Sequence, residues 1–221
     1  MRSSEAVSNK GCYERYWKRL IDCILSFCGL ILFLPLLLIL TLVGIVKMHG
    51  NPFFSQERAT KDERVFRLWK FRTMTDETDA QGELLPDEER LTPYGKFLRS
   101  TSLDELPQLW NILKGDMALV GPRPLPERYL PRYSAEQHRR HEVRAGLTGL
   151  SQVQGRNSVT WEERFRTDVW YVDHISLLGD VKIVCLTVFR VLERKDISSE
   201  TEATMEEFMG NETQQEEKTV L

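Results

Sequence analysis

The chain has 221 residues with 30 basic and 33 acidic side chains, a net charge of −3, and 41% hydrophobic residues. This length fits one domain or at most two, and this balance excludes collagen, a disordered chain and a protein with many membrane spans. Nucleic acid is excluded as a partner because the chain has no strong basic excess. The four cysteines form no CxxC pair and no metal-ligand spacing, which indicates a reducing compartment.

Hydrophobicity and charge are distributed unevenly along the chain. Residues 23–46 are 24 consecutive residues without a charge. Residues 198–221 contain seven Glu and one Lys, a net charge of −6, so the remainder carries about +3. We therefore predict three parts: a membrane-associated N-terminal helix over residues 1–47, a folded domain over residues 48–197, and an acidic, loosely ordered tail over residues 198–221.

The apolar run is long enough to cross a bilayer, because 24 helical residues extend about 36 Å and the hydrocarbon layer is roughly 30 Å thick. A signal peptide is a poor alternative, since no small-residue cleavage site follows the run. Pro35 predicts a kink, and basic residues flank both ends of the run, which favours a re-entrant helix-break-helix with two cytoplasmic ends. A single straight span stays open as well, because spanning helices tolerate proline.

Three elements are expected after the membrane segment. Residues 65–72 (VFRLWKFR) alternate with period two, which predicts a strand with a cationic face that includes Lys70 and Arg72. Solvated charges on a half-buried strand are the commoner explanation of such a pattern. Residues 75–90 predict a loop or a short helix. Residues 103–113 have apolar side chains at helical spacing, and Gly115 predicts the end of that helix.

The start of this last helix decides its chemistry. If Ser102 were the N-cap, Pro107 would be the fifth helical residue, where its missing N–H is needed. If Asp104 is the N-cap, Pro107 is the third, where the N–H has no helical partner anyway. We therefore expect the helix to begin at Asp104, with the helix dipole keeping this carboxylate ionised and ready to attack phosphorus. Helix capping without catalysis is the simpler alternative.

The rest of the domain adds a rigid loop and two helices. In the sequence Gly121-Pro122-Arg123-Pro124, the prolines predict a stiff loop whose arginine loses little entropy when it binds an anion. An exposed arginine in an ordinary turn is the plainer alternative. The glycine-rich residues 144–157 predict loop and strand. Residues 161–171 predict a helix with Asp168 off its apolar side, and residues 177–192 predict an apolar helix at a membrane surface or on the domain.

These motifs closely resemble those of the monotopic phosphoglycosyl transferases, the bacterial sugar transferase family. The resemblance covers about residues 16–197 and includes KRxxD at 18–22, KFRTM at 70–74, RSTSLDELPQLWNILKGDMALVGPRP from 99, and GLTGLSQVQGRN from 146. The short chain is most similar to members that transfer diacetylbacillosamine phosphate in bacterial protein N-glycosylation. Those members break the membrane helix at Ser-Pro, whereas Leu34 precedes Pro35 here.

The resemblance implies a mostly helical α+β fold: a re-entrant membrane helix broken near Pro35, and a compact catalytic domain with amphipathic surface helices on the cytoplasmic face of the bacterial inner membrane. It implies an enzyme that transfers a sugar-1-phosphate from a UDP-sugar, an N-acetylated amino sugar, to the polyprenyl lipid undecaprenyl phosphate and releases UMP. The reaction would pass through a covalent phosphosugar-aspartate intermediate and begin the assembly of a glycoconjugate or a glycoprotein glycan.

The resemblance also implies residue roles. Asp104 would be the nucleophile, and Glu105 would hold Mg²⁺, with general-base help as a second possibility. Phosphate contacts would come from four basic side chains: Lys70, Arg72, Arg99 and Arg123. Asp168 would lie near the metal or the nucleotide. Two rivals stay open, namely direct transfer in which Asp104 only holds metal, and a membrane-anchored adaptor that is not an enzyme.

Overall fold

The computed structural model describes residues 11–155, 159–193 and 207–210, and the expectations for the rest of the acidic tail lie outside these residues. The architecture is α+β and mostly helical, as expected. The helices are α1 (Lys18–Lys47), α2 (Asp87–Arg90), α3 (Pro93–Ser100), α4 (Gln108–Lys114), α5 (Ala135–His138), α6 (Leu150–Gly155), α7 (Trp161–Asp173) and α8 (Leu177–Glu193). The strands are β1 (Phe53–Ala59), β2 (Val65–Phe71), β3 (Ala118–Val120) and β4 (Gly146–Thr148). Shorter turns are the π-helical Tyr13–Trp17 and the 3₁₀ helices Lys61–Glu63, Leu103–Glu105, Glu127–Arg132 and Arg139–Glu142.

The strands form two small sheets. β1 and β2 form an antiparallel hairpin that pairs Phe53 with Phe71, which confirms the predicted strand up to the residue before Arg72. β3 and β4 are parallel and pair Ala118 with Gly146. A Cβ on Gly146 would lie 2.1 Å from the Gly121 nitrogen, so only glycine allows the end of β3 and the start of β4 to approach this closely.

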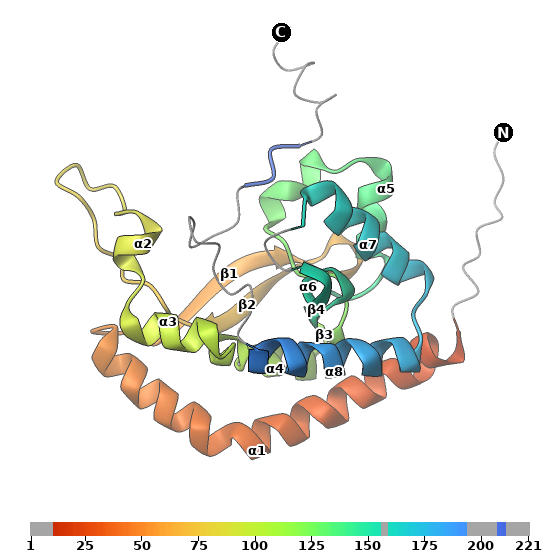
Figure 1. Ribbon diagram of the computed structural model, residues 1–221, viewed down its shortest axis with the longest axis horizontal. Helices are drawn as coiled ribbons and strands as arrows, with labels where there is room; N and C mark the ends of the chain where they lie inside the picture. Colours follow the sequence, from red (N-terminus) through yellow and green to blue (C-terminus); the bar gives the residue numbers. More distant parts are fainter. Residues whose placement is uncertain (1–10, 156–158, 194–206, 211–221) are drawn as a thin grey trace, which may run out of the picture.

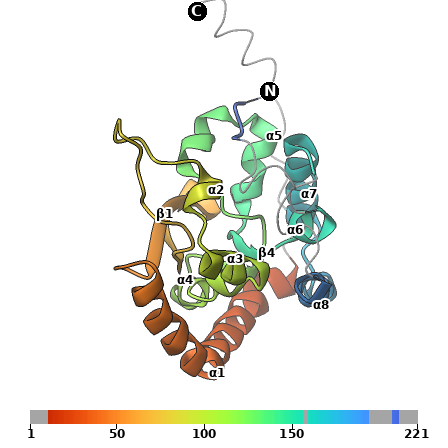
Figure 2. The same cartoon turned by 60° about the vertical axis from the view of Figure 1, so that its left-hand side comes forward.

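The molecule is arranged in layers (Figures 1 and 2). α1 lies along one side, α3, α4 and α8 form the layer next to it, and the hairpin, α5, α6 and α7 lie beyond. The core between α4 and the hairpin is apolar and consists of Phe66, Leu68, Leu109, Ile112 and Met117. Burial of these side chains holds α4 on β2. The predicted helices at 161–171 and 177–192 are confirmed as α7 and α8.

The apolar run forms one helix without an interruption. α1 continues through Pro35, so a break is not shown, although both views show the helix bent. The segment Tyr13–Lys47 is long and apolar enough to cross a membrane, with a mean hydropathy of 2.9 over its most apolar 18 residues, of which 11% are buried. Its large side chains are therefore mostly exposed, including Ile24, Phe27, Ile31, Leu32, Leu38, Leu42 and Val46.

Both ends of α1 are fixed to the same domain. At the N-terminal end, Lys18 Nζ lies 2.5 Å from Asp180 Oδ2 on α8, and Arg19 Nη2 donates to the Leu113 carbonyl of α4 at 2.8 Å. At the C-terminal end, the Tyr94 hydroxyl of α3 donates to the Leu40 carbonyl at 2.8 Å. Both the N-terminal and the C-terminal parts of the bent helix therefore contact the same folded domain.

The helices beside α1 are amphipathic. α8 buries Asp180 and Ile183 against the domain and exposes the large apolar side chains Leu178, Val181, Val188, Phe189 and Leu192. In the same layer, Phe97 of α3 and Trp110 of α4 are about half exposed. Because this much apolar surface is unusual for a protein that meets only water, the layer is suited to a lipid surface.

The four described residues of the tail are ordered on the domain. Phe208 is 4% exposed and packs with buried Tyr129, Tyr133 and Phe165. The expectation of a loosely ordered tail is therefore wrong for residues 207–210. A single buried aromatic side chain offsets the polar composition around it, and composition averaged over the tail conceals such an anchor.

Candidate functional site

The acidic pair does not lie at the start of α4. Asp104 and Glu105 belong to the 3₁₀ helix Leu103–Glu105, and α4 begins at Gln108. Ser102 makes no side-chain cap and has a left-handed backbone with φ of 55°. The expected helix start was therefore wrong. The physical reason is that the chain turns sharply at Ser102, and Pro107, which cannot donate a hydrogen bond, separates the 3₁₀ helix from α4.

Asp104 is a buried carboxylate without a close partner. Its residue is 8% exposed, and among the described residues no side chain hydrogen-bonds to it. Burial raises the pKa of Asp104 to about 6, and the neighbouring Glu105 adds to this, while Lys70, Arg99 and Arg123 oppose it. Asp104 is therefore mostly ionised at neutral pH, and the nearby cations favour this state.

Two cations reach Asp104 from different elements. Lys70 comes from the end of β2, with Nζ 5.3 Å from the centre of the Phe54 ring. Arg99 comes from α3 and donates from Nε to Thr73 Oγ1 at 3.1 Å. Burial lowers the pKa of both side chains, and Asp104 opposes that shift. The structure therefore brings these two predicted residues together around the carboxylate.

Arg123 completes the cationic wall from the loop after β3. Its Nη2 lies 3.1 Å from Glu105 Oε1. Four successive carbonyls of this loop accept hydrogen bonds: Pro122 from the Gly146 N–H at 2.9 Å, Arg123 from Arg140 Nη2 at 2.7 Å, Pro124 from Arg58 Nη1 at 3.4 Å and Leu125 from the Ala59 N–H at 3.1 Å. The guanidinium of Arg123 therefore projects from a backbone that is already ordered.

Two predicted site residues have other partners. Asp168 is 1% exposed; its Oδ2 accepts from Arg140 at 2.8 Å and its Oδ1 from Ser151 at 2.8 Å. It therefore holds Arg140, which holds the Arg123 carbonyl, and both of its oxygens are already engaged. The expectation that Asp168 lies near the metal or the nucleotide stays a prediction, and its carboxylate is bonded within the protein. Arg72 pairs with Asp76 just beyond β2, so its guanidinium is shared with a neighbouring acid.

Glu105 is the residue expected to hold a magnesium ion. Mg²⁺ is usually bound through one or two carboxylates, substrate phosphates and water, so it does not require a cage of protein ligands. Among the described residues no cluster of three or more His, Cys, Asp or Glu side chains could hold a metal. Within the part of the chain that the structure describes, only one Glu105 oxygen is paired, to Arg123, so its second oxygen is a carboxylate donor of the type that Mg²⁺ takes.

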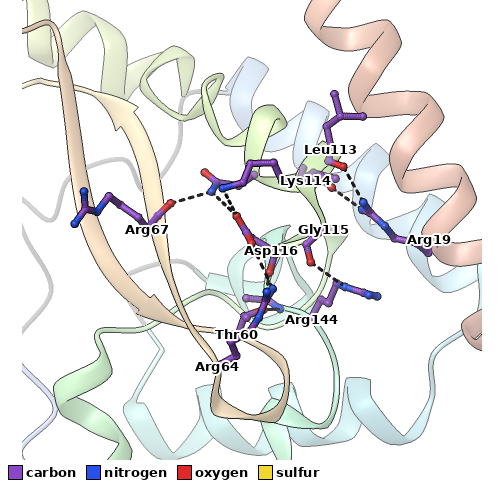
Figure 3. Close-up of polar contacts among 12 residues, drawn as sticks. Arg19, Thr60, Arg64, Arg67, Leu113, Lys114, Gly115, Asp116 and Arg144 are labelled. Carbon is purple, nitrogen blue, oxygen red and sulfur yellow. Dashed lines mark hydrogen bonds and ion pairs between the residues drawn. The ribbon is translucent and has the colours of Figure 1, made fainter.

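Sequence reasoning missed the network that fixes α4 (Figure 3). The Asn111 side chain donates to the Arg67 carbonyl at 2.9 Å and to Asp116 Oδ2 at 3.2 Å, which ties α4 to β2. Asp116 also pairs with Lys114 at 2.9 Å and Arg64 at 3.3 Å. This network holds the acidic pair, which precedes α4, beside Lys70. The missed signal was the placement of polar Asn111 between two core residues of α4.

Comparisons with known proteins identify relatives over most of the chain. The family model described as "Bacterial sugar transferase" matches residues 13–194. The chain is 50% identical over 196 residues to the uncharacterized sugar transferase EpsL of Bacillus subtilis. This alignment covers 88% of the present chain and 96% of EpsL. The chain is 39% identical to UDP-glucose:undecaprenyl-phosphate glucose-1-phosphate transferase of Klebsiella pneumoniae, over 79% of this chain and 40% of that protein. Undecaprenyl-phosphate galactose phosphotransferase of Salmonella typhimurium is 36% identical over 82% of this chain and 41% of its own length.

Proposed function

The chain belongs to the bacterial sugar transferase family, and we propose that it transfers a sugar-1-phosphate from a UDP-sugar to undecaprenyl phosphate with release of UMP. The observation that carries the proposal is the buried Asp104 carboxylate, which has no close partner and is surrounded by Lys70, Arg99 and Arg123. A donor diphosphate and an acceptor phosphate are both anionic, so a nucleophilic carboxylate needs this cationic surrounding to approach phosphorus.

A two-step route fits this arrangement. A carboxylate oxygen of Asp104 attacks the sugar-bearing phosphorus, a bond forms between that oxygen and phosphorus, and the bond to the bridging oxygen breaks. UMP leaves with the electron pair. A phosphate oxygen of the lipid then attacks the same phosphorus, forms the lipid diphosphate sugar and returns Asp104 as a carboxylate. No net proton transfer is required in either step.

The protein's other groups bind and orient charge in this route. Lys70, Arg99 and Arg123 offset the charge of the phosphates, and Glu105 holds Arg123 in place through their ion pair of 3.1 Å. Glu105 would hold Mg²⁺, which would supply further charge neutralisation at the transferring phosphoryl group. General-base help by Glu105 is the second possibility, and it would apply only if the attacking phosphate oxygen carried a proton.

The membrane placement follows from α1 and the layer beside it. We propose that α1 is re-entrant, with both ends on the cytoplasmic face of the inner membrane. The attachment of Lys18 and Leu40 to one domain supports this, because a straight span would carry one end to the opposite side. The exposed apolar side chains of α3, α4 and α8 would then lie at the headgroups, where the lipid phosphate is found.

We propose an N-acetylated amino sugar as the donor sugar and a glycoconjugate or glycoprotein glycan as the product's destination. The test is UMP release by the full chain in lipid nanodiscs that contain undecaprenyl phosphate, with Mg²⁺ and a panel of UDP-sugars. Selective turnover of UDP-N-acetylated amino sugars supports the proposed donor. Selective turnover of UDP-glucose or UDP-galactose, the sugars in two relatives' names, would replace that donor and retain the reaction. No UMP from any UDP-sugar would reject the function.

A further inference from the structure

The segment 207–210 lies outside the family match at residues 13–194 and yet packs into the domain. The Phe208 ring lies 5.0 Å from the Phe165 ring and 5.9 Å from the Tyr133 ring, measured between centroids. The rings of Trp161 and Tyr129 complete the enclosure at 5.5 Å and 5.9 Å. Contacts with four aromatic rings make Phe208 an integral part of this cluster.

Polar contacts fix the same segment from outside. The Glu207 carboxylate accepts from Arg132 Nη1 at 2.8 Å and from Arg128 Nη2 at 3.1 Å. Arg132 also donates to the Phe208 carbonyl, and the Phe208 N–H donates to the Tyr129 hydroxyl at 3.3 Å. These partners all lie on the 3₁₀ helix Glu127–Arg132, which follows the Arg123 loop in the chain.

The aromatic cluster supports the cation that holds the Arg123 loop. The Arg140 guanidinium lies 5.7 Å from the centre of the Phe165 ring and 5.9 Å from that of Tyr133. The same guanidinium donates to the Arg123 carbonyl at 2.7 Å and to Asp168 at 2.8 Å. Phe208 packs on the two rings that flank Arg140, so three contacts connect the tail to the backbone of Arg123.

We infer that Phe208 is a positioning residue for the proposed transfer reaction: docked by Glu207, it holds Tyr133 and Phe165 against Arg140 and thereby fixes Arg123 beside Glu105. The inference rests on the proposed function, in which Arg123 binds a donor phosphate. Phe208 itself touches no reacting atom in this account. Its effect passes through packing, so its loss should weaken donor binding and transfer without abolishing either.

The test compares tail variants of the full chain in nanodiscs. Phe208→Ala, and a chain ending at residue 206, should lower kcat/KM for the UDP-sugar about fivefold to tenfold, mainly through KM. A chain ending at residue 210 and the conservative Phe208→Leu should stay within about twofold of the full chain, because both keep the enclosed apolar group. Glu207→Gln, which alters only an exposed contact, should give a smaller loss in the same direction.

A double-mutant cycle separates positioning from simple loss of stability. In an Arg123→Ala background, Phe208→Ala should lower the remaining kcat/KM by less than about twofold, because its effect passes through Arg123. Hydrogen exchange of residues 120–126 should also become faster in the chain that ends at residue 206. An equal loss in both backgrounds, unchanged kcat/KM in Phe208→Ala, or unchanged exchange would each overturn the inference. If the wild-type chain releases no UMP, the proposed function fails instead, which is a different outcome.

Discussion

Two buried aspartates on either side of α4 have the same exposure and opposite surroundings. Asp104 and Asp116 are each 8% exposed. Asp116 accepts from Asn111 at 3.2 Å and pairs with Lys114 at 2.9 Å and Arg64 at 3.3 Å, whereas Asp104 has cations nearby but no close partner among the described residues. The hydrogen bonds and ion pairs of Asp116 are therefore made within the protein, whereas the carboxylate of Asp104 is available to a ligand.

This difference assigns a structural role to Asp116 and a functional role to Asp104. A buried charge that is fully bonded fixes structure, and a buried charge without bonds destabilises the fold but remains reactive. The region around Asp116 therefore provides a matched control for each residue around Asp104: Asp116 for Asp104, Arg64 for Arg123 and Lys114 for Lys70.

The largest effect is expected for the nucleophile. Asp104→Asn should lower UMP release by a factor on the order of 10³ or more, because an amide cannot form the covalent intermediate. It should also raise the free energy of unfolding by about 1–3 kcal/mol, since the pKa of Asp104 is raised to about 6 and ionisation at pH 7 opposes folding. UMP assays and chemical denaturation measure the two results. An active Asp104→Asn variant would end the account.

The phosphate-binding arginine should give the next largest effect. Arg123→Ala should lower kcat/KM about 100-fold, because one charge-assisted contact to a phosphate is lost. The matched change Arg64→Ala should leave kcat/KM within about twofold of wild type, since its guanidinium is exposed and its ion pair among the described residues is with Asp116. Steady-state kinetics of both variants gives the two kcat/KM values. Equal losses of kcat/KM in the two variants would contradict a phosphate-binding role for Arg123.

The satisfied aspartate should matter for stability instead. Asp116→Ala should lower the free energy of unfolding by about 2–4 kcal/mol, because Asn111 and Lys114 lose a buried partner. The kcat of the folded fraction should remain within about threefold of wild type, because Asn111 still bonds the Arg67 carbonyl and keeps α4 on β2 without Asp116. Chemical denaturation together with active-site titration separates the two quantities. A large loss of kcat without a loss of stability would reverse the roles assigned to the two aspartates.

The smallest effect is expected in the pH dependence. The rate of the first UMP release, measured without lipid acceptor, should rise with pH with a midpoint at about 6, as Asp104 loses its proton. Lys70→Met removes a cation that lowers this pKa, so the rise should move to higher pH. Lys114→Met should leave the profile unchanged. A profile that moves with Lys114 and not with Lys70 would contradict the assignment.

Sequence patterns predicted the elements that depend on local periodicity. The predictions of β2, α7, α8 and the end of α4 at Gly115 are confirmed, because alternation, helical spacing and glycine stops act over a few residues. The helix start at Asp104 was wrong, since the left-handed Ser102 reflects tertiary packing that no local pattern encodes. Ordinary capping rules could not anticipate it.

The site was predictable only in part for the same reason. The structure brings Lys70, Arg99 and Arg123 to the acidic pair, as the motifs suggested. The engagement of Asp168 by Arg140, and the docking of Phe208, depend on segments far apart in the chain, and a charge run such as residues 138–142 gives no sign of which member is buried. Long-range partners of this kind require the folded coordinates.

The central claim is that Asp104 forms a bond to phosphorus, and one measurement tests it directly. The full chain, in nanodiscs without lipid acceptor, is mixed with Mg²⁺ and a UDP-sugar that it accepts as a substrate. The reaction is quenched and analysed by mass spectrometry, and the peptide that contains Asp116 serves as the internal comparison. The account predicts one phosphosugar on the peptide that contains Asp104, a matching burst of UMP, and loss of the adduct when undecaprenyl phosphate is added. An active enzyme that shows no adduct and no burst would contradict the account and favour direct transfer between the two substrates.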